Sequence, residues 1–333
     1  MYKDYKNGTA TFVIPHWRTE NDLSRKHLDE TIQGIMNQTD DNWNIVLVDD
    51  DSPCKEAKEY LETIKALNPE KIHVIYCEEN KGPGHARNCG IEFAYKNGSP
   101  IVLFNDADDI SNPKRLENVR KKFIENDDVN VVYSTFKVID ENSNLVEESK
   151  LSPAIYETLE GHTRDIVEGE NAWIAIATDK NYTNLTSATA VRTDLAYMEP
   201  FPLVKASEDA NTWLRYAAHK GQFIYDATIP SLYRIPQNTE CSTRARLNNF
   251  YEVKANVDSD GFFKAMEIAL ENKNIDYSQC NSLKVKFYVK LAESLLNGKQ
   301  KELAKEQINK AMLISRDETS ELLGQKEELK ILC

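Results

Sequence analysis

Residues 101–109 of this chain read Ile101-Val102-Leu103-Phe104-Asn105-Asp106-Ala107-Asp108-Asp109, so that an apolar run leads directly into a carboxylate cluster. Such a run predicts a buried β-strand with the acidic residues just beyond its carboxyl end. Three carboxylates within four residues repel one another unless water or a divalent cation lies between them. Hard oxygen ligands of this kind suit Mg²⁺ or Mn²⁺. The alternative interpretation is a solvated acidic turn that caps a helix beginning near Pro113.

The same succession of strand, polar segment and helix repeats along the first 125 residues. Apolar runs predict strands at residues 10–14, 43–48, 72–76 and 101–104, with helical spacing of apolar residues between them. The unusual polar segments, residues 15–18, 49–52, 81–88 and 106–109, all follow such runs. We therefore predict an α/β fold, a mainly parallel central sheet flanked by helices on both faces. In such sheets, ligands bind beyond the carboxyl ends of the strands.

The regular alternation ends after the helix expected at residues 112–124. Strands are expected at 129–133 and 136–139, with a hairpin turn at 142–144. Residues 151–205 have weak periodicity and many Thr, Asn, Tyr and Trp residues, which suits either a polar substrate pocket or irregular packing. A helix then opens with Glu208-Asp209 and ends at Gly221. A strand at 223–225 and a loop from 232 onward complete this part.

Beyond about residue 245 the pattern is helical and charged. Phe287, Leu291 and Leu295 recur at a spacing of four residues, and a break at Asn297-Gly298 separates them from a later helical stretch. We predict antiparallel helices that pack on the rest of the chain or on a partner, including a second copy. The predicted division is a domain over residues 1–244 followed by a C-terminal helical extension over 245–333.

The overall charge and the apolar runs limit the classes of partner. A formal net charge of -13 argues against binding to nucleic acid, which needs clustered Lys and Arg. No run of about 18 apolar residues predicts a transmembrane helix, and the segment from Met1 to Lys6 lacks the apolar core of a signal peptide. These features predict a cytoplasmic protein and are compatible with peripheral contact at the inner face of a membrane.

The six cysteines are dispersed along the chain without a Cys-x-x-Cys pair. Closely spaced cysteines are the usual signature of zinc sites, and secreted domains carry cysteines as disulfide frameworks. The sequence therefore indicates neither kind of site.

Taken in order, the polar segments resemble the motifs of the inverting family 2 glycosyltransferases, which have the GT-A nucleotide-diphospho-sugar transferase fold. The resemblance covers roughly residues 11–234. Each motif alone is weak, whereas their common order at predicted strand ends is specific. The motifs are Phe12-Val13-Ile14-Pro15-His16, Gln38-Thr39 with Val46-Leu47-Val48-Asp49-Asp50, Asn80-Lys81-Gly82 with Ala86-Arg87-Asn88-Cys89-Gly90, Asp106-Ala107-Asp108, and Glu208-Asp209.

The resemblance implies transfer of a sugar, with inversion, from a UDP-hexose or UDP-N-acetylhexosamine to a hydroxyl of a saccharide, lipid-linked or protein acceptor. It implies a donor half at about 1–135 and an acceptor half at about 136–244. Asp106 and Asp108 would bind Mn²⁺ or Mg²⁺, and Asp209 would be the catalytic base, with Glu208 orienting it. The implied donor-binding residues are Pro15, His16, Asp49, Asp50, Lys81, Gly82, Arg87, Asn105 and Asp106.

Simpler interpretations exist for several of these residues. Asp49 and Asp50 also suit a solvated turn, and Arg87 suits a structural role beside the acidic cluster. Asp209 also suits a helix N-terminus, where the macrodipole favours acids. In the cluster, we assign Asp109 to a helix cap and not to the metal.

The sequence departs from the family pattern in two places. Asp51 stands where the family has a glycine, which puts the backbone of that turn in doubt, and residues 236–238 (Pro-Gln-Asn) replace a histidine found in many relatives. Arg244 or Arg246 is a candidate contact for the diphosphate from the same loop. The competing functions are a sugar-nucleotide or glycan-binding subunit without turnover and a sugar-phosphate nucleotidylyltransferase, whose early Gly-rich triphosphate loop is not seen.

Overall fold

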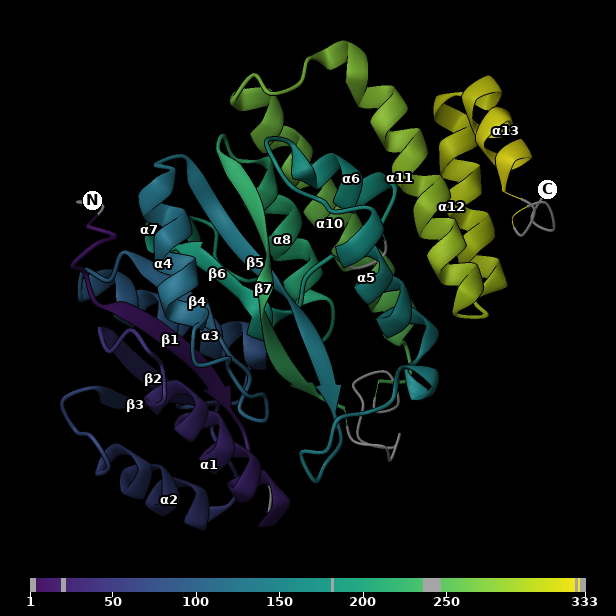
Figure 1. Cartoon of the computed structure of the whole chain (residues 1–333). Coiled ribbons are helices and arrows are strands. Elements are labelled where there is room, and N and C mark those ends of the chain that lie inside the picture. Colours follow the sequence, from purple (N-terminus) through teal and green to yellow (C-terminus); the bar gives the residue numbers. More distant parts are fainter. Residues whose placement is uncertain (1–3, 19–21, 181–182, 236–246, 327–328, 330–333) are drawn as a thin grey trace. The chain divides into compact units, whose positions relative to one another are not determined.

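The structure, a computed structural model, describes residues 4–18, 22–180, 183–235, 247–326 and 329 (Figure 1). The chain forms two compact units. The first comprises Met1–Glu168, Asn184–Val204 and Gly221–Thr239, and the second comprises Gly169–Thr183, Lys205–Lys220 and Glu240–Cys333. The functional division at residue 244, and the donor and acceptor halves before it, stay predictions.

The first unit is built on a seven-stranded sheet in the order β3-β2-β1-β4-β6-β5-β7. Parallel pairs join β1 to β2 and β4, β2 to β3, and β5 to β7, whereas β6 lies antiparallel between β4 and β5. The predicted α/β class with a mainly parallel sheet is therefore confirmed. The strands are β1 (Ala10–His16), β2 (Trp43–Asp49), β3 (Ile72–Tyr76), β4 (Ile101–Phe104), β5 (Val129–Ile139), β6 (Thr189–Arg192) and β7 (Gln222–Arg234).

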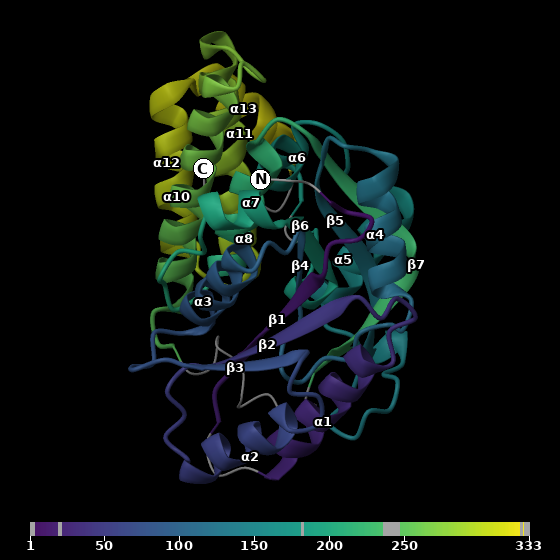
Figure 2. The same cartoon turned by 90° about the vertical axis from the view of Figure 1, so that its left-hand side faces the viewer.

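Helices cover both faces of β1–β3. Figure 2 shows α1 and α2 on one side of these strands and α3 on the other side. The central strands are buried on both faces, so they consist of continuous apolar runs such as Ile45-Val46-Leu47-Val48, which is fully buried. The helices of this unit are α1 (Asp22–Met36), α2 (Lys55–Lys65), α3 (Pro83–Lys96), α4 (Arg115–Glu125), α5 (Pro153–Arg164) and α7 (Thr193–Met198), with short 3₁₀ turns η1 (Glu148–Lys150) and η2 (Thr186–Ala188).

Five local predictions were wrong. Residues 129–133 and 136–139, predicted as two strands, form the single strand β5. Strand β6 was not expected, and residues 232–234, expected to start a loop, lie in β7 beside the end of β5. Helix α3 begins at Pro83, which places Arg87 on a helix instead of in a loop. Strand β1 continues through Pro15 to His16, because β4 pairs with β1 only as far as Val13 and leaves no ladder bond for a proline to break.

The second unit consists of helices in its described residues. Its aromatic core stacks Phe262 of α10 on Phe287 of α11 with ring centroids 4.1 Å apart, and Trp173 of α6 packs beside them. Helix α11 ends at Asn297, so the predicted break is confirmed. The helices are α6 (Ala172–Thr178), α8 (Glu208–Ala218), α10 (Phe250–Glu271), α11 (Tyr277–Asn297), α12 (Lys301–Ile314) and α13 (Arg316–Gln325).

Within the residues that the structure describes, no helix combines the length and the apolar character needed to cross a membrane.

The turn after β2 keeps a glycine-like backbone although its residue is Asp51. Its φ of 55° lies in the left-handed region, which costs a residue with a Cβ atom free energy that glycine does not pay. The departure from the family sequence at this position therefore leaves the turn in the conformation that a glycine would adopt.

Substitution of Asp51 tests this strain. Asp51→Gly is expected to raise the free energy of unfolding by roughly 0.5 kcal/mol, because relief of the left-handed cost exceeds the added chain entropy of glycine. Asp51→Val should lower it by roughly 1–2 kcal/mol, since a β-branched residue fits this region poorly. Urea denaturation of both variants measures the two shifts. Shifts of the same sign would contradict the assignment of strain to this φ.

Candidate active site

A cavity of about 830 Å³ lies in the first unit, at the carboxyl ends of β1, β2 and β4. This volume is in the range of sites that enclose a small organic ligand. The polar segments that follow these strands meet there, as expected for an open α/β sheet. The residues that line the cavity are Pro15, His16, Trp17, His27, Asp50, Asp51, Pro53, Asn80, Gly82, Pro83, Arg87, Asp106, Ala107 and Asp108.

At the end of β1, a buried carboxylate holds His16 in place. The His16 Nδ1 atom lies 2.9 Å from Oδ1 of Asp49, and the Ser52 hydroxyl donates to the same oxygen at 2.5 Å. Burial opposes ionisation of Asp49, but the hydrogen bonds from His16 and Ser52 outweigh it and lower the pKa of this carboxyl. Because a carboxylate only accepts, His16 donates through Nδ1. Asp49 is not among the residues lining the cavity, so its direct contact with a donor stays a prediction.

At the end of β2, Asp50 fixes the segment that precedes α3. Its carboxylate accepts the backbone N–H of Gly82 at 2.6 Å and that of Lys81 at 3.2 Å. Gly82 has a φ of 90°, which glycine adopts readily, and it lines the cavity. The Lys81 ammonium instead pairs with Glu79 and does not line the cavity, so its predicted donor contact stays untested.

At the end of β4, Asp106 and Asp108 both line the cavity. Arg87, a buried residue of α3, donates from Nη2 to Oδ1 of Asp106 at 2.7 Å. Burial and the neighbouring Asp106 raise the pKa of Asp108 to about 6, although Arg234 opposes the shift. The structural role considered for Arg87 is therefore seen in this contact.

These two carboxylates fit a hard divalent cation. They come from one short turn and face the same cavity, and burial together with repulsion from Asp106 disfavours ionisation of Asp108. A divalent cation between them would remove that repulsion, and carboxylate oxygens are the ligands that Mg²⁺ and Mn²⁺ prefer.

The other polar residues of this turn hold it in shape. The Asn105 amide donates to the carbonyl oxygens of Asp106 and Asp109, at 2.9 and 3.0 Å. Asp109 is buried and accepts the Arg234 backbone N–H at 2.7 Å and the Ser187 hydroxyl at 2.5 Å. The assignment of Asp109 to a helix cap is therefore wrong, since its carboxylate links three segments of the first unit. Asn105 does not line the cavity, so its donor contact stays a prediction.

Glu208 and Asp209 form the first turn of α8 in the second unit. Ser207 before them has a φ of 64°, and Asp209 Oδ1 accepts the backbone N–H of Ala210 at 2.8 Å. This contact suits the helix-terminus interpretation. The roles of Glu208 and Asp209 stay predictions. The predictions for residues 236–238, Arg244 and Arg246 fall outside the described residues.

Seven lining residues were not among the predicted site residues: Trp17, His27, Asp51, Pro53, Asn80, Pro83 and Ala107. Asn80 and Ala107 stand inside quoted motifs, and the others except His27 lie within three positions of one. His27 lies on α1, and its Nε2 lies 2.9 Å from the carbonyl oxygen of Glu141. Nothing in the spacing of the sequence distinguishes His27 from other polar residues of that helix.

Comparison with known proteins gives a family match. A sequence model described as Glycosyl transferase family 2 matches residues 11–181. An uncharacterised glycosyltransferase of Methanocaldococcus jannaschii is 29% identical over 226 residues, which cover 68% of this chain and 72% of that protein. An uncharacterised glycosyltransferase of Nostoc is 31% identical over 149 residues, 44% of each chain. WfgD of Escherichia coli, a UDP-Glc:alpha-D-GlcNAc-diphosphoundecaprenol beta-1,3-glucosyltransferase, is 26% identical over 134 residues, 40% of this chain and 48% of WfgD.

Solved structures with the same fold extend over nearly the whole chain. TarS 1-349 of S. aureus in complex with UDP-GlcNAc superposes with a TM-score of 0.57 at 16% identity, over 93% of this chain and 89% of that chain. The mannosyltransferase PcManGT of Pyrobaculum calidifontis in complex with GDP-Man and Mn²⁺ has a TM-score of 0.54 at 15% identity, over 99% and 83%. At these identities the likeness establishes the fold.

Proposed function

The chain belongs to glycosyl transferase family 2, and on this premise we propose that it transfers a hexose or N-acetylhexosamine from a UDP-sugar to an acceptor hydroxyl with inversion. The observation that carries this proposal is the convergence of Asp50, Arg87, Asp106 and Asp108 on one cavity. That cavity lies at the strand ends where a nucleotide is expected to bind.

In this proposal different walls of the cavity bind different parts of the donor. His16 and Asp50 at the ends of β1 and β2 offer acceptors for the N–H of uracil and the hydroxyls of ribose. Asp106 and Asp108 hold Mn²⁺ or Mg²⁺, which when bound supplies positive charge to the diphosphate leaving group. Arg87 orients Asp106 through their 2.7 Å contact.

Asp209 is the proposed base. It takes the proton of the acceptor hydroxyl as the acceptor oxygen bonds to the anomeric carbon and the bond from that carbon to the diphosphate oxygen breaks. A single displacement of this kind inverts the anomeric configuration, and one carboxylate is sufficient for it. Glu208 is proposed to orient Asp209 or the acceptor.

Ligands named for similar proteins support the choice of donor. TarS was solved with UDP-GlcNAc, and WfgD is named for a UDP-Glc donor and a lipid-linked acceptor. PcManGT was solved with GDP-Man and Mn²⁺, which supports the proposed metal and gives guanine as a second nucleotide base to compare with uracil. We propose that the acceptor is a saccharide, a lipid-linked molecule or a protein. We also propose that the protein acts in the cytoplasm, with peripheral contact at the inner membrane face, and that it self-associates through the C-terminal helices.

One assay distinguishes this function from its competitors. The protein is incubated with UDP- and GDP-sugars and Mn²⁺, with and without saccharide or lipid-linked acceptors, and released nucleoside diphosphate is measured. Acceptor-dependent UDP release is expected, and it should stop when EDTA removes the metal. Pyrophosphate release would indicate a nucleotidylyltransferase. Mn²⁺-dependent UDP binding without release for any acceptor would favour a binding subunit.

Asp50 offers a test of the nucleotide end of the cavity. Oδ2 of Asp50 accepts the Gly82 N–H and Oδ1 accepts the Lys81 N–H, and Asp50→Asn replaces one of these two oxygens by an N–H donor. Donor affinity is expected to fall roughly 10-fold, as for the loss of a hydrogen bond to a charged group. Calorimetric titration with UDP measures it. Glu125→Gln, which changes an exposed carboxylate of α4 that pairs with Lys121, should leave the affinity unchanged.

A further inference from the structure

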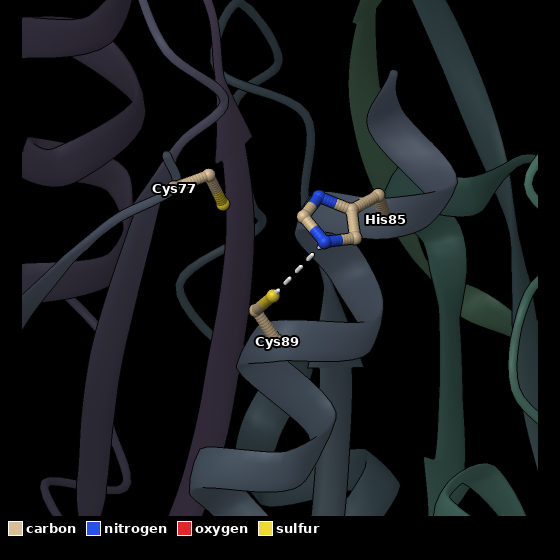
Figure 3. Close-up of side chains that lie close together, drawn as sticks. All are labelled: Cys77, His85 and Cys89. Carbon is tan, nitrogen blue, oxygen red and sulfur yellow. Dashed lines mark hydrogen bonds between the residues drawn. The ribbon is translucent and has the colours of Figure 1, made fainter. Parts of the chain in front are cut away.

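Three soft or borderline metal ligands meet beside the cavity, although they are scattered in the sequence. Cys77 directly follows β3, and His85 and Cys89 lie one helical turn apart on the same face of α3 (Figure 3). Their ligand atoms all lie within 4.8 Å of one another. Sequence spacing indicated no zinc site, because the three residues do not form a local Cys-x-x-Cys turn. The connection from β3 into α3 brings them together instead.

The orientation of His85 suits metal binding. Its Nε2 faces the thiols, 3.9 Å from Sγ of Cys89, while its Nδ1 lies 3.3 Å from Oδ1 of Asp50 (Figure 3). Metal-binding histidines usually donate their second ring N–H to a carboxylate in this way, which fixes the tautomer and leaves the other nitrogen to the metal. Asp50 is itself held by the backbone N–H of Gly82.

We propose that Cys77, His85 and Cys89 bind one Zn²⁺ ion, with a water molecule as the fourth ligand. Two thiolates and an imidazole are a ligand set that Zn²⁺ favours over Mg²⁺ or Mn²⁺. Tetrahedral zinc with its usual bond lengths separates two sulfur ligands by roughly 3.8 Å. The present separations of the three ligand atoms, all within 4.8 Å, exceed that value by about 1 Å at most.

Zinc binding at this site would be coupled to proton release. Burial and the neighbouring thiol of Cys89 raise the pKa of Cys77 to about 12, and burial also raises the pKa of Cys89. Zn²⁺ displaces the thiol protons, and two thiolates then neutralise the ion. The hard-oxygen site at Asp106 and Asp108 lacks such ligands, so the two sites select different metals.

Zinc at this place would stiffen one wall of the cavity. It would tie the end of β3 to the first turns of α3, and the His85 N–H would hold Asp50, which lines the cavity together with Gly82. The expected role is therefore structural support of the nucleotide end of the site. The zinc site does not depend on which reaction the cavity performs.

Cobalt substitution tests the proposal without any measurement of turnover. The full chain is reduced, freed of reductant and metal under nitrogen, and titrated with Co²⁺. A thiolate-to-cobalt charge-transfer band in the near ultraviolet is expected, saturating at one equivalent and abolished by one equivalent of Zn²⁺. Asp106→Ala/Asp108→Ala should keep the band, because it arises from sulfur ligands alone.

Cysteine variants then locate the ion. Cys77→Ser and Cys89→Ser are each expected to weaken Zn²⁺ binding roughly 100-fold or more and to reduce the band, since each removes a direct ligand. Cys280→Ser, a matched change on α11, should bind as the unaltered protein does. Absence of the band in fully reduced, folded protein would overturn the proposal. A band that persists at full intensity in both Cys77→Ser and Cys89→Ser would also overturn it.

Discussion

Asp106→Ala/Asp108→Ala is expected to lose the metal dependence of donor binding and to reduce sugar transfer roughly 100-fold or more. The two carboxylates are the hard ligands that face the cavity from the end of β4. Burial and the neighbouring Asp106 disfavour the ionisation of Asp108, and a divalent cation bound there would favour it. Without these ligands, the charge that develops on the departing diphosphate has no divalent counter-ion.

The measurement compares UDP affinity in Mn²⁺ and in EDTA for each protein. The unaltered protein should bind more tightly in Mn²⁺, and the variant should bind equally in both. Absolute affinity alone would mislead, because removal of Asp106 breaks its contact with Arg87 and leaves that cation to attract phosphate. Asp41→Ala removes an exposed carboxylate just before the amino-terminal end of β2, whereas the cavity lies at the carboxyl end of this strand. This variant should keep the Mn²⁺ effect. An undiminished effect in the double variant would remove Asp106 and Asp108 as ligands.

The strands, and the strand ends at which the site lies, could be predicted from the sequence. Strands that are buried on both faces consist of continuous apolar residues, so they are recognisable as apolar runs. The run before Asp106 and the run before Asp49 each leave a carboxylate at a strand end. Parallel order then brings those ends together without any knowledge of side-chain contacts. Strand β6 was missed because its four residues, Thr189–Arg192, are too short to show a period.

The division of labour among neighbouring polar residues could not be predicted, because it depends on distant partners. The Asp109 carboxylate accepts from the Ser187 hydroxyl and the Arg234 backbone N–H, which lie far along the chain, whereas Asp108 lines the cavity. Asp49 differs from Asp50 in meeting His16. Alternation of side chains along the chain says that such neighbours point differently, but not which of them faces the cavity.

Asp209→Asn is expected to reduce transfer roughly 1,000-fold while donor binding stays within about twofold. Asparagine keeps the size of the side chain and the oxygen that accepts the Ala210 N–H, but it cannot take a proton at neutral pH. A loss confined to turnover would therefore identify proton transfer, whereas parallel losses in UDP affinity and turnover would identify a structural or donor-binding role. Near-normal turnover would exclude Asp209 as the base.

The competing explanation for Asp209 is an ordinary acid at a helix N-terminus, and the chain contains a matched control. Asp317 is the second residue of α13, as Asp209 is of α8, and it is exposed. Loss of the interaction with the helix dipole costs about 0.3–1 kcal/mol at such positions, so Asp317→Asn should lower the free energy of unfolding slightly and leave transfer unchanged. Both variants should then lose a similar small amount of stability. If only Asp209→Asn also loses turnover by about 1,000-fold, as expected for a missing base, the loss of stability cannot explain it. The difference between the two variants therefore isolates the chemistry of the Asp209 carboxylate from its place at the start of a helix.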